Sequence, residues 1–166
     1  MNVLELEPIV RVRQNHALEH ATIHLLTRSD PTLRLVGRST SKGFYIYGPV
    51  DTRALGDAAS EALARLQAGE SDLAIHPRCG TGIATAGVLA GLAAFVVLRT
   101  RRKPGLSDLP SVLTATTLAV MVAQPLGLKV QQKVTTTPEL QGVRISEVRR
   151  QETGQMLIHQ VRLEHD

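Results

Sequence analysis

The sequence predicts an α+β membrane protein with three parts. Residues 1–79 should form a small N-terminal α/β domain, residues 80–128 a two-helix transmembrane hairpin, and residues 129–166 a C-terminal β-hairpin. Three observations lead to this fold class: a helical pattern with a histidine at every fourth position, two long uncharged stretches, and apolar–polar alternation near the end. A chain of 166 residues has room for one small domain beside two membrane segments.

The N-terminal part begins with a predicted helix. Pro8 suits the first turn of a helix, which should run to about Thr27 and end before Asp30 and Pro31. Two short apolar runs follow, at residues 33–39 and 44–47, and the polar residues between them predict a β-hairpin.

A second helix is predicted after this hairpin. Asp51 is a suitable N-cap, the helix should reach Gln67, and Gly69 lies just past its end. We expect residues 73–75 to form a short strand that leads to His76.

Two segments have the length and composition of membrane helices. Residues 80–98 and 109–128 contain no charge, and each can cross about 30 Å of hydrocarbon as a helix. The alternative is a pair of buried helices in a soluble protein, but so small a chain could hardly cover two helices that are apolar all round.

The segment between these helices suits a tight turn through Pro104 and Gly105. Small residues at Gly87 and Gly91 predict a face where the second helix approaches closely. Pro125 should kink or end that second helix. Farther along, residues 142–150 and 155–163 alternate apolar and polar side chains around a turn at 152–154, which predicts the C-terminal β-hairpin.

The charge distribution argues against nucleic acid as a partner. The formal net charge is +4, yet residues 1–79 carry nine basic and nine acidic side chains. The excess lies in the loop between the apolar segments, where Arg99, Arg101, Arg102 and Lys103 face one acid, Asp108. A nucleic-acid-binding face would need basic residues spread along it and interleaved with aromatic ones.

Two features argue against a secreted, disulfide-bonded protein. The single cysteine excludes an intramolecular disulfide, and the N-terminal residues lack the basic and apolar regions of a signal peptide.

The residues that carry chemistry begin with His16-Ala17-Leu18-Glu19-His20, an H-x-x-E-H pattern on the first predicted helix. Imidazoles four residues apart share one helical face and can bind the same ion. His24 continues this face, and Glu19 lies at its edge, where a carboxylate could activate water. The alternative is a polar surface on which the histidines have no function.

A second cluster, His76-Pro77-Arg78-Cys79, supplies further donors. Together, His16, His20, His76 and Cys79 form a set of three nitrogens and one sulfur that suits zinc. If all four bind, the site is structural; if water replaces one of them, Glu19 becomes a general base and the site is hydrolytic. Cys79 could instead be a small packed side chain at a helix start.

These motifs resemble an uncharacterised bacterial membrane family, domain-of-unknown-function family 6391. They are also similar to the predicted metal-dependent membrane enzymes of domain-of-unknown-function family 1385. The matching positions are His16, Glu19 and His20, then 76–81, then Gln132, Thr135 and Thr136. The resemblance implies a metal-dependent membrane protein without an established reaction. The chain departs from the larger group in having fewer membrane segments and Ala21 in place of a basic residue.

Several polar residues could support the metal or the substrate. We expect Gln132, Thr135 and Thr136 to donate or accept hydrogen bonds behind the metal ligands, although an ordinary polar helix exit explains them equally well. His24 could have the same role. Arg78 could bind an anionic substrate group or lie among lipid headgroups.

The leading functional hypothesis is a zinc hydrolase integral to the cytoplasmic (plasma) membrane, with Glu19 as the catalytic base. The alternative is a non-catalytic assembly factor or accessory subunit with a structural metal. Expected partners are the lipid bilayer and other proteins or copies of this chain within it. By the positive-inside rule the basic loop should lie in the cytoplasm, which would place the His-rich domain on the other side of the membrane. The free cysteine and the absence of a signal peptide instead favour a cytosolic metal domain, and this second argument is preferred.

Overall fold

The computed structural model describes residues 3–101, 103, 105–153 and 156–166. The chain divides into two compact units. The first unit combines Met1–His76 with Gln132–Asp166, and the second unit is Pro77–Gln131. Three residues of the predicted turns, Arg102, Pro104 and Gly154, lie outside the described residues.

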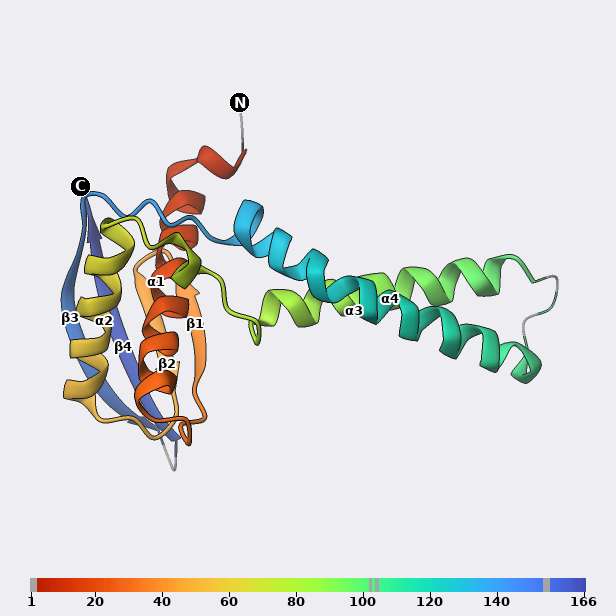
Figure 1. Cartoon of the computed structure of the whole chain (residues 1–166), viewed down its shortest axis with the longest axis horizontal. Coiled ribbons are helices and arrows are strands. Elements are labelled where there is room, and N and C mark those ends of the chain that lie inside the picture. Colours follow the sequence, from red (N-terminus) through yellow and green to blue (C-terminus); the bar gives the residue numbers. More distant parts are fainter. Residues whose placement is uncertain (1–2, 102, 104, 154–155) are drawn as a thin grey trace. The chain divides into compact units, whose positions relative to one another are not determined.

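The first unit is an α+β domain built on one antiparallel sheet. Its strands are β1 (Val36–Thr40), β2 (Gly43–Tyr47), β3 (Val143–Thr153) and β4 (Met156–His165). The strand order is β1-β2-β4-β3. The C-terminal hairpin therefore forms one sheet with the N-terminal hairpin, and α1 and α2 lie side by side against one face of it (Figure 1).

The two predicted helices of this unit are confirmed. Helix α1 runs over Glu7–Ser29 with a proline in its first turn, and α2 runs over Thr52–Gln67. The Asp51 side chain caps α2 by accepting hydrogen bonds from the backbone N–H groups of Arg53 and Ala54, each at 2.9 Å. Just past its end, Gly69 has a φ of +97°, a conformation that favours glycine.

The core lies between the helices and the sheet because alternate strand residues point toward α1 and α2. Phe44 pairs with Val161 and Ile46 with His159, and all four side chains are fully buried. The turn between β1 and β2 requires glycine at position 43: its φ is +133°, and a Cβ there would lie 2.0 Å from the Val161 carbonyl oxygen.

The short strand predicted at residues 73–75 is wrong. Ser71–Ala74 form a 3₁₀ helix, η2. Its backbone N–H groups find partners locally, as when Leu73 donates to the Glu70 carbonyl and Ile75 to that of Asp72. The carbonyls at the end of η2 instead accept hydrogen bonds from histidine rings of α1, which no sequence pattern signals.

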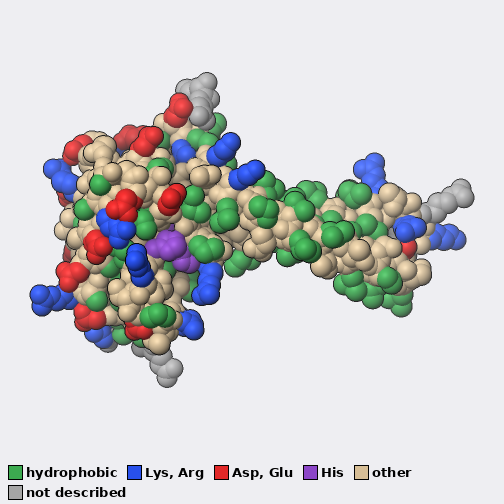
Figure 2. All heavy atoms as spheres, in the orientation of Figure 1, with side chains coloured by type: hydrophobic (Ala, Val, Ile, Leu, Met, Phe, Trp, Pro, Cys, Tyr) green, Lys and Arg blue, Asp and Glu red, His purple; other side chains and the backbone are tan. Residues whose placement is uncertain are grey.

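The second unit consists of two long helices, α3 (Gly80–Arg99) and α4 (Leu109–Val130), and α4 continues into a π-helical turn (Gln131–Thr135). Both helical segments are long and apolar enough to cross a membrane. None of the side chains of α3 is buried, and large apolar residues such as Ile83, Phe95 and Met121 are mostly exposed. Green apolar side chains accordingly cover the surface of this hairpin in Figure 2.

The close approach of α3 and α4 occurs at glycines other than the predicted ones. A Cβ at Gly127 would lie 3.0 Å from the Cα of Gly82, whereas added Cβ atoms at Gly87 and Gly91 would meet nothing within 4 Å. Pro125 does not end α4, which continues to Val130.

Candidate metal centre

Four histidine rings gather in the first unit. His16, His20 and His24 lie one turn apart on α1, and His76 follows η2. The ring centroids of His16 and His20 are 4.3 Å apart, and His76 lies 5.8 Å from His20 and 4.7 Å from His24. Figure 2 shows purple histidine side chains on the surface of the first unit. The structure thus brings together four of the histidines that the sequence singled out.

Backbone carbonyls fix the protonation of three of these rings. Nδ1 of His16 lies 2.9 Å from the Thr135 carbonyl oxygen, and Nδ1 of His20 lies 2.7 Å from that of Ala74. For His24 it is Nε2 that contacts a carbonyl, that of Ile75, at 2.8 Å. A carbonyl only accepts hydrogen bonds, so each of these nitrogens carries the proton. His16 and His20 therefore direct Nε2 away from these carbonyls, and His24 directs Nδ1 away.

His20 has the strongest signature of a metal ligand. Its side chain is only 2 % exposed, and Nε2 has no hydrogen-bond partner among the described residues. Buried polar atoms are nearly always paired. A histidine that donates from one nitrogen to a carbonyl and directs the lone pair of the other nitrogen to an unfilled position has the arrangement found in metal sites.

Glu19 points toward strand β1. It is 5 % exposed, and the Ser39 hydroxyl donates a hydrogen bond to Oε2. A Cβ on Gly37 would lie 2.0 Å from Oε1, so glycine at this position leaves the space that the carboxylate occupies. Burial raises the pKa of Glu19, and the Ser39 hydrogen bond and the nearby His16 oppose that rise.

Asn15 extends this buried polar contact between α1 and β1. It is fully buried one turn before Glu19, and its Nδ2 donates to the Thr40 carbonyl at 2.7 Å. Sequence reasoning missed Asn15, Gly37 and Ser39. Asn15 had one signal, its i, i+4 spacing to Glu19, which places the two side chains on one helical face. Gly37 and Ser39 had none.

The residues predicted to support the metal ligands have different placements. The Thr135 backbone carbonyl, rather than its hydroxyl, contacts His16. Thr136 is 1 % exposed and its carbonyl accepts a hydrogen bond from Arg13 at 3.0 Å, whereas Gln132 is exposed. His24 contacts Ile75 and His76, as described above.

Cys79 and Arg78 belong to the second unit. Cys79 is the N-cap of α3, where its sulfur accepts a hydrogen bond from the Thr81 backbone N–H at 3.4 Å. It follows His76 by three residues, and the chain alone limits their Cα separation to roughly 11 Å. Arg78 is exposed.

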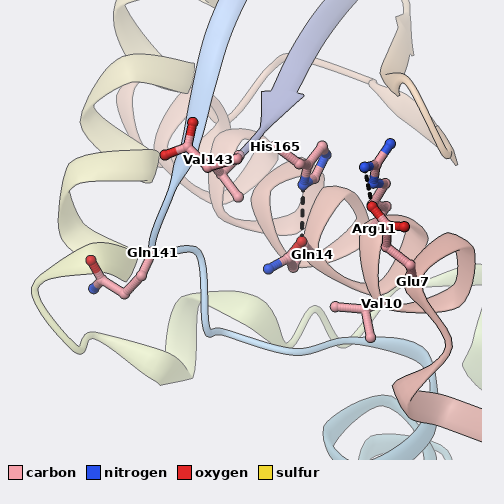
Figure 3. A pocket seen from close by; sticks show the side chains of 8 residues that line it. Glu7, Val10, Arg11, Gln14, Gln141, Val143 and His165 are labelled. Carbon is pink, nitrogen blue, oxygen red and sulfur yellow. Dashed lines mark hydrogen bonds and ion pairs between the residues drawn. The ribbon is translucent and has the colours of Figure 1, made fainter.

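A separate cavity of about 140 Å³ lies near the start of α1 (Figure 3). Its lining includes Gln14, which accepts a hydrogen bond from His165 Nδ1 at 3.0 Å, and an ion pair between Glu7 and Arg11. The residues of the histidine cluster do not line this cavity.

Comparison with known proteins identifies the family. The model of a domain of unknown function, DUF6391, matches residues 11–148. An uncharacterized protein of Picosynechococcus sp. is 43 % identical over 145 residues, which cover 79 % of this chain and 68 % of that protein. No solved structure matches the chain. The protein belongs to the DUF6391 domain family.

Proposed function

We propose that this protein is a membrane-anchored metalloprotein that binds one zinc ion through His16, His20 and one or both of His76 and Cys79, with a coordination position open to water, and that it acts as a hydrolase. The observation that carries the proposal is the buried Nε2 of His20, which has no partner among the described residues. The adjacent ring of His16 is oriented in the same way, because both rings donate from Nδ1 to carbonyls.

The donors fit zinc. Imidazole nitrogens together with a thiolate suit this ion better than magnesium or calcium, which prefer oxygen. Cys79 is proposed as a ligand because the chain tethers it to His76 and because a helix N-terminus with an N–H donor to the sulfur favours the thiolate. His24 and the Thr135 carbonyl would orient the ligands through their contacts.

The hydrolytic role assigns Glu19 as the general base. When bound, zinc supplies a Lewis acid that activates water for attack on a carbonyl. Glu19 would accept the proton, and its raised pKa moves the carboxylate toward the range in which a base works at neutral pH. Ser39 would hold the carboxylate in one orientation through Oε2. Peptide, amide or lipid-linked bonds that arrive along the bilayer are the proposed substrates.

One observation favours the alternative, a structural metal in an assembly factor or accessory subunit. Glu19 is buried against β1 and already accepts a hydrogen bond from Ser39. A carboxylate in this position also stabilises the contact between α1 and the sheet, so its presence does not require catalysis.

The helical hairpin supports anchoring in a membrane. The proposed location is the plasma membrane, crossed twice, with the metal domain in the cytosol. Exposed apolar side chains on α3 and α4 need an apolar environment. The bilayer and other proteins or copies of this chain within it are the proposed partners. A relationship to domain-of-unknown-function family 1385 would agree with a metal-dependent membrane enzyme.

Metal content tests the site first. Elemental analysis of the detergent-purified protein should give about one zinc per chain, and His20→Ala should abolish it. His165→Ala is the matched control, because His165 also has a buried Nε2 without a described partner but lies outside the cluster. Absence of zinc in the wild-type protein would refute the metal site. Unchanged occupancy in Cys79→Ser would remove this residue from the ligand set.

Glu19→Gln separates the two roles. The amide keeps the shape of the carboxylate, so zinc content and folding should be preserved in either case. In a screen of peptidase and esterase substrates, turnover that survives in Glu19→Gln would contradict Glu19 as the base. Ser39→Ala should retain zinc but reduce turnover, since it removes only the donor to Oε2.

A further inference from the structure

The charges of the second unit are concentrated at one end. Between Gly80 and Gln131, the basic residues are Lys129 near the end of α4 and four side chains in residues 99–103. Asp108 is the only acid in this part of the sequence. The loop that joins α3 and α4 is therefore strongly cationic, whereas residues 80–98 and 109–128 carry no charge.

The carboxylate of Asp108 is already paired within the loop. Asp108 is 8 % exposed, and its carboxylate pairs with Arg101 at 3.1 Å and accepts a hydrogen bond from the Gly105 backbone N–H at 3.1 Å. Arg99 and Lys103 are exposed and, among the described residues, pair with no acidic side chain. The internal ion pair shapes the loop but leaves its charge in excess.

Apolar side chains surround these cations. Leu106 is 90 % exposed and Leu109 is 51 % exposed, and both follow directly on the basic residues. Long basic side chains at the ends of apolar helices place their stems along hydrocarbon and their charged groups among headgroups. A soluble anion would neutralise the charge but would leave the leucines in water, whereas a lipid satisfies both.

We propose that Arg99, Arg101 and Lys103, between α3 and α4, form a docking surface for the headgroups of anionic phospholipids. This inference rests on the membrane anchoring proposed above and is independent of the metal. Arg99 and Lys103 would contact the lipid phosphates directly, and the pairing with Asp108 would hold Arg101 beside them.

Lipid retention by the full-length protein tests this surface. The protein in detergent is mixed with equal amounts of phosphatidylglycerol and phosphatidylcholine, and the retained lipids are counted by native mass spectrometry. The wild-type protein should retain the anionic lipid at least tenfold more often. One basic side chain at an anionic surface contributes about fivefold in binding. The variant Arg99→Gln, Arg101→Gln, Lys103→Gln should therefore lose this selectivity.

A second triple variant, Arg28→Gln, Arg38→Gln, Arg53→Gln, removes the same charge from exposed positions of the first unit and should keep the selectivity. Equal retention of both lipids by the wild-type protein would overturn the proposal, as would equal losses in the two triple variants. Extraction of cell membranes with carbonate shows separately whether the chain is membrane-integrated. His20→Ala, which tests the metal, should leave lipid selectivity unchanged.

Discussion

The two units place polar and apolar groups in opposite ways. The first unit buries polar side chains, such as Asn15, Glu19 and His20, and nearly every one has a specific hydrogen-bond partner. The second unit exposes its apolar side chains, and its α3 buries none of them. Its buried charged group, Asp108, lies at the loop.

This difference shows what each part of the chain requires of its surroundings. Buried polar groups are costly unless they are paired, so the first unit is specified by individual contacts at fixed distances. Apolar exposure is costly only in water, so the second unit is specified by helix length and by the packing of its two helices against each other. Substitutions should therefore have sharply local effects in the first unit and graded effects in the second.

The largest stability effect is expected at Gly37. In Gly37→Ala the new methyl group would overlap the Glu19 carboxylate, which is buried between α1 and β1 and would have to shift. Overpacking of this kind costs about 1–3 kcal/mol. Chemical denaturation should show this loss. Gly56→Ala is the control, because its Cβ would meet only Val148 at 3.9 Å and alanine favours a helix; a comparable loss there would contradict the specific role of Gly37.

In the second unit, Gly127→Ala should weaken the contact between α3 and α4. The added methyl group would lie 3.0 Å from the Cα of Gly82, so the backbones must separate slightly, at a cost of about 1 kcal/mol. Thermal unfolding in detergent should show a lower Tm. Gly91→Ala, where the new atom meets nothing within 4 Å, should leave the Tm unchanged or raise it.

Removing the N-cap of α2 should lower stability by an amount similar to or smaller than that expected for Gly127→Ala. Asp51→Ala removes the acceptor for two backbone N–H groups and should lower the free energy of unfolding by about 1 kcal/mol. Asp57→Ala, at an exposed position within the same helix, should change it little. Equal effects of both substitutions would indicate a general charge effect instead of capping.

The smallest effect should appear as a dependence on pH. Burial lowers the pKa of His159 and so does Arg150, while Asp51 partly opposes them; its Nε2 lies 3.0 Å from the Thr52 hydroxyl. Burial also lowers the pKa of His165, as does Arg11. Because the pKa values of His159 and His165 are lowered in the folded state, the unfolded chain takes up protons first as the pH falls. The contribution of these two histidines to stability is therefore complete above about pH 6.5 and is lost as the pH falls below it.

Unfolding measured from pH 8 to pH 5 in the presence of a chelator tests this dependence, because metal loss then contributes nothing. His159→Gln keeps a hydrogen-bonding side chain but cannot titrate, so its stability should fall less steeply with acid. An unchanged slope would show that His159 does not contribute.

Local patterns predicted most of the fold. Proline at the start of α1, Asp51 before α2 and the alternation in both hairpins each act over a few residues, and the structure confirms the elements they indicate. The pairing of β2 with β4 was not predictable in this way, because register between distant strands depends on how both pack against α1 and α2. The same applies to η2, whose carbonyls contact histidines about fifty positions away.

The candidate site was predictable in its residue types but not in its supporting contacts. Histidine spacing on α1 indicated a shared face, and His16 and His20 do lie together. The residues that hold Glu19 are a glycine and a serine on β1, which have no distinctive pattern. Thr135 contributes through its backbone, and a backbone carbonyl leaves no mark on the sequence. Metal binding itself stays a prediction.

The central position of β4 has a consequence for the order of events during synthesis. Its pairing with β2 joins residues more than a hundred positions apart, such as Gly43 and Arg162. Until β4 leaves the ribosome, β2 lacks its second neighbouring strand and the sheet is incomplete. The apolar hairpin emerges earlier, so the membrane insertion proposed for it would precede closure of the domain. The domain then assembles from two segments that the hairpin already connects.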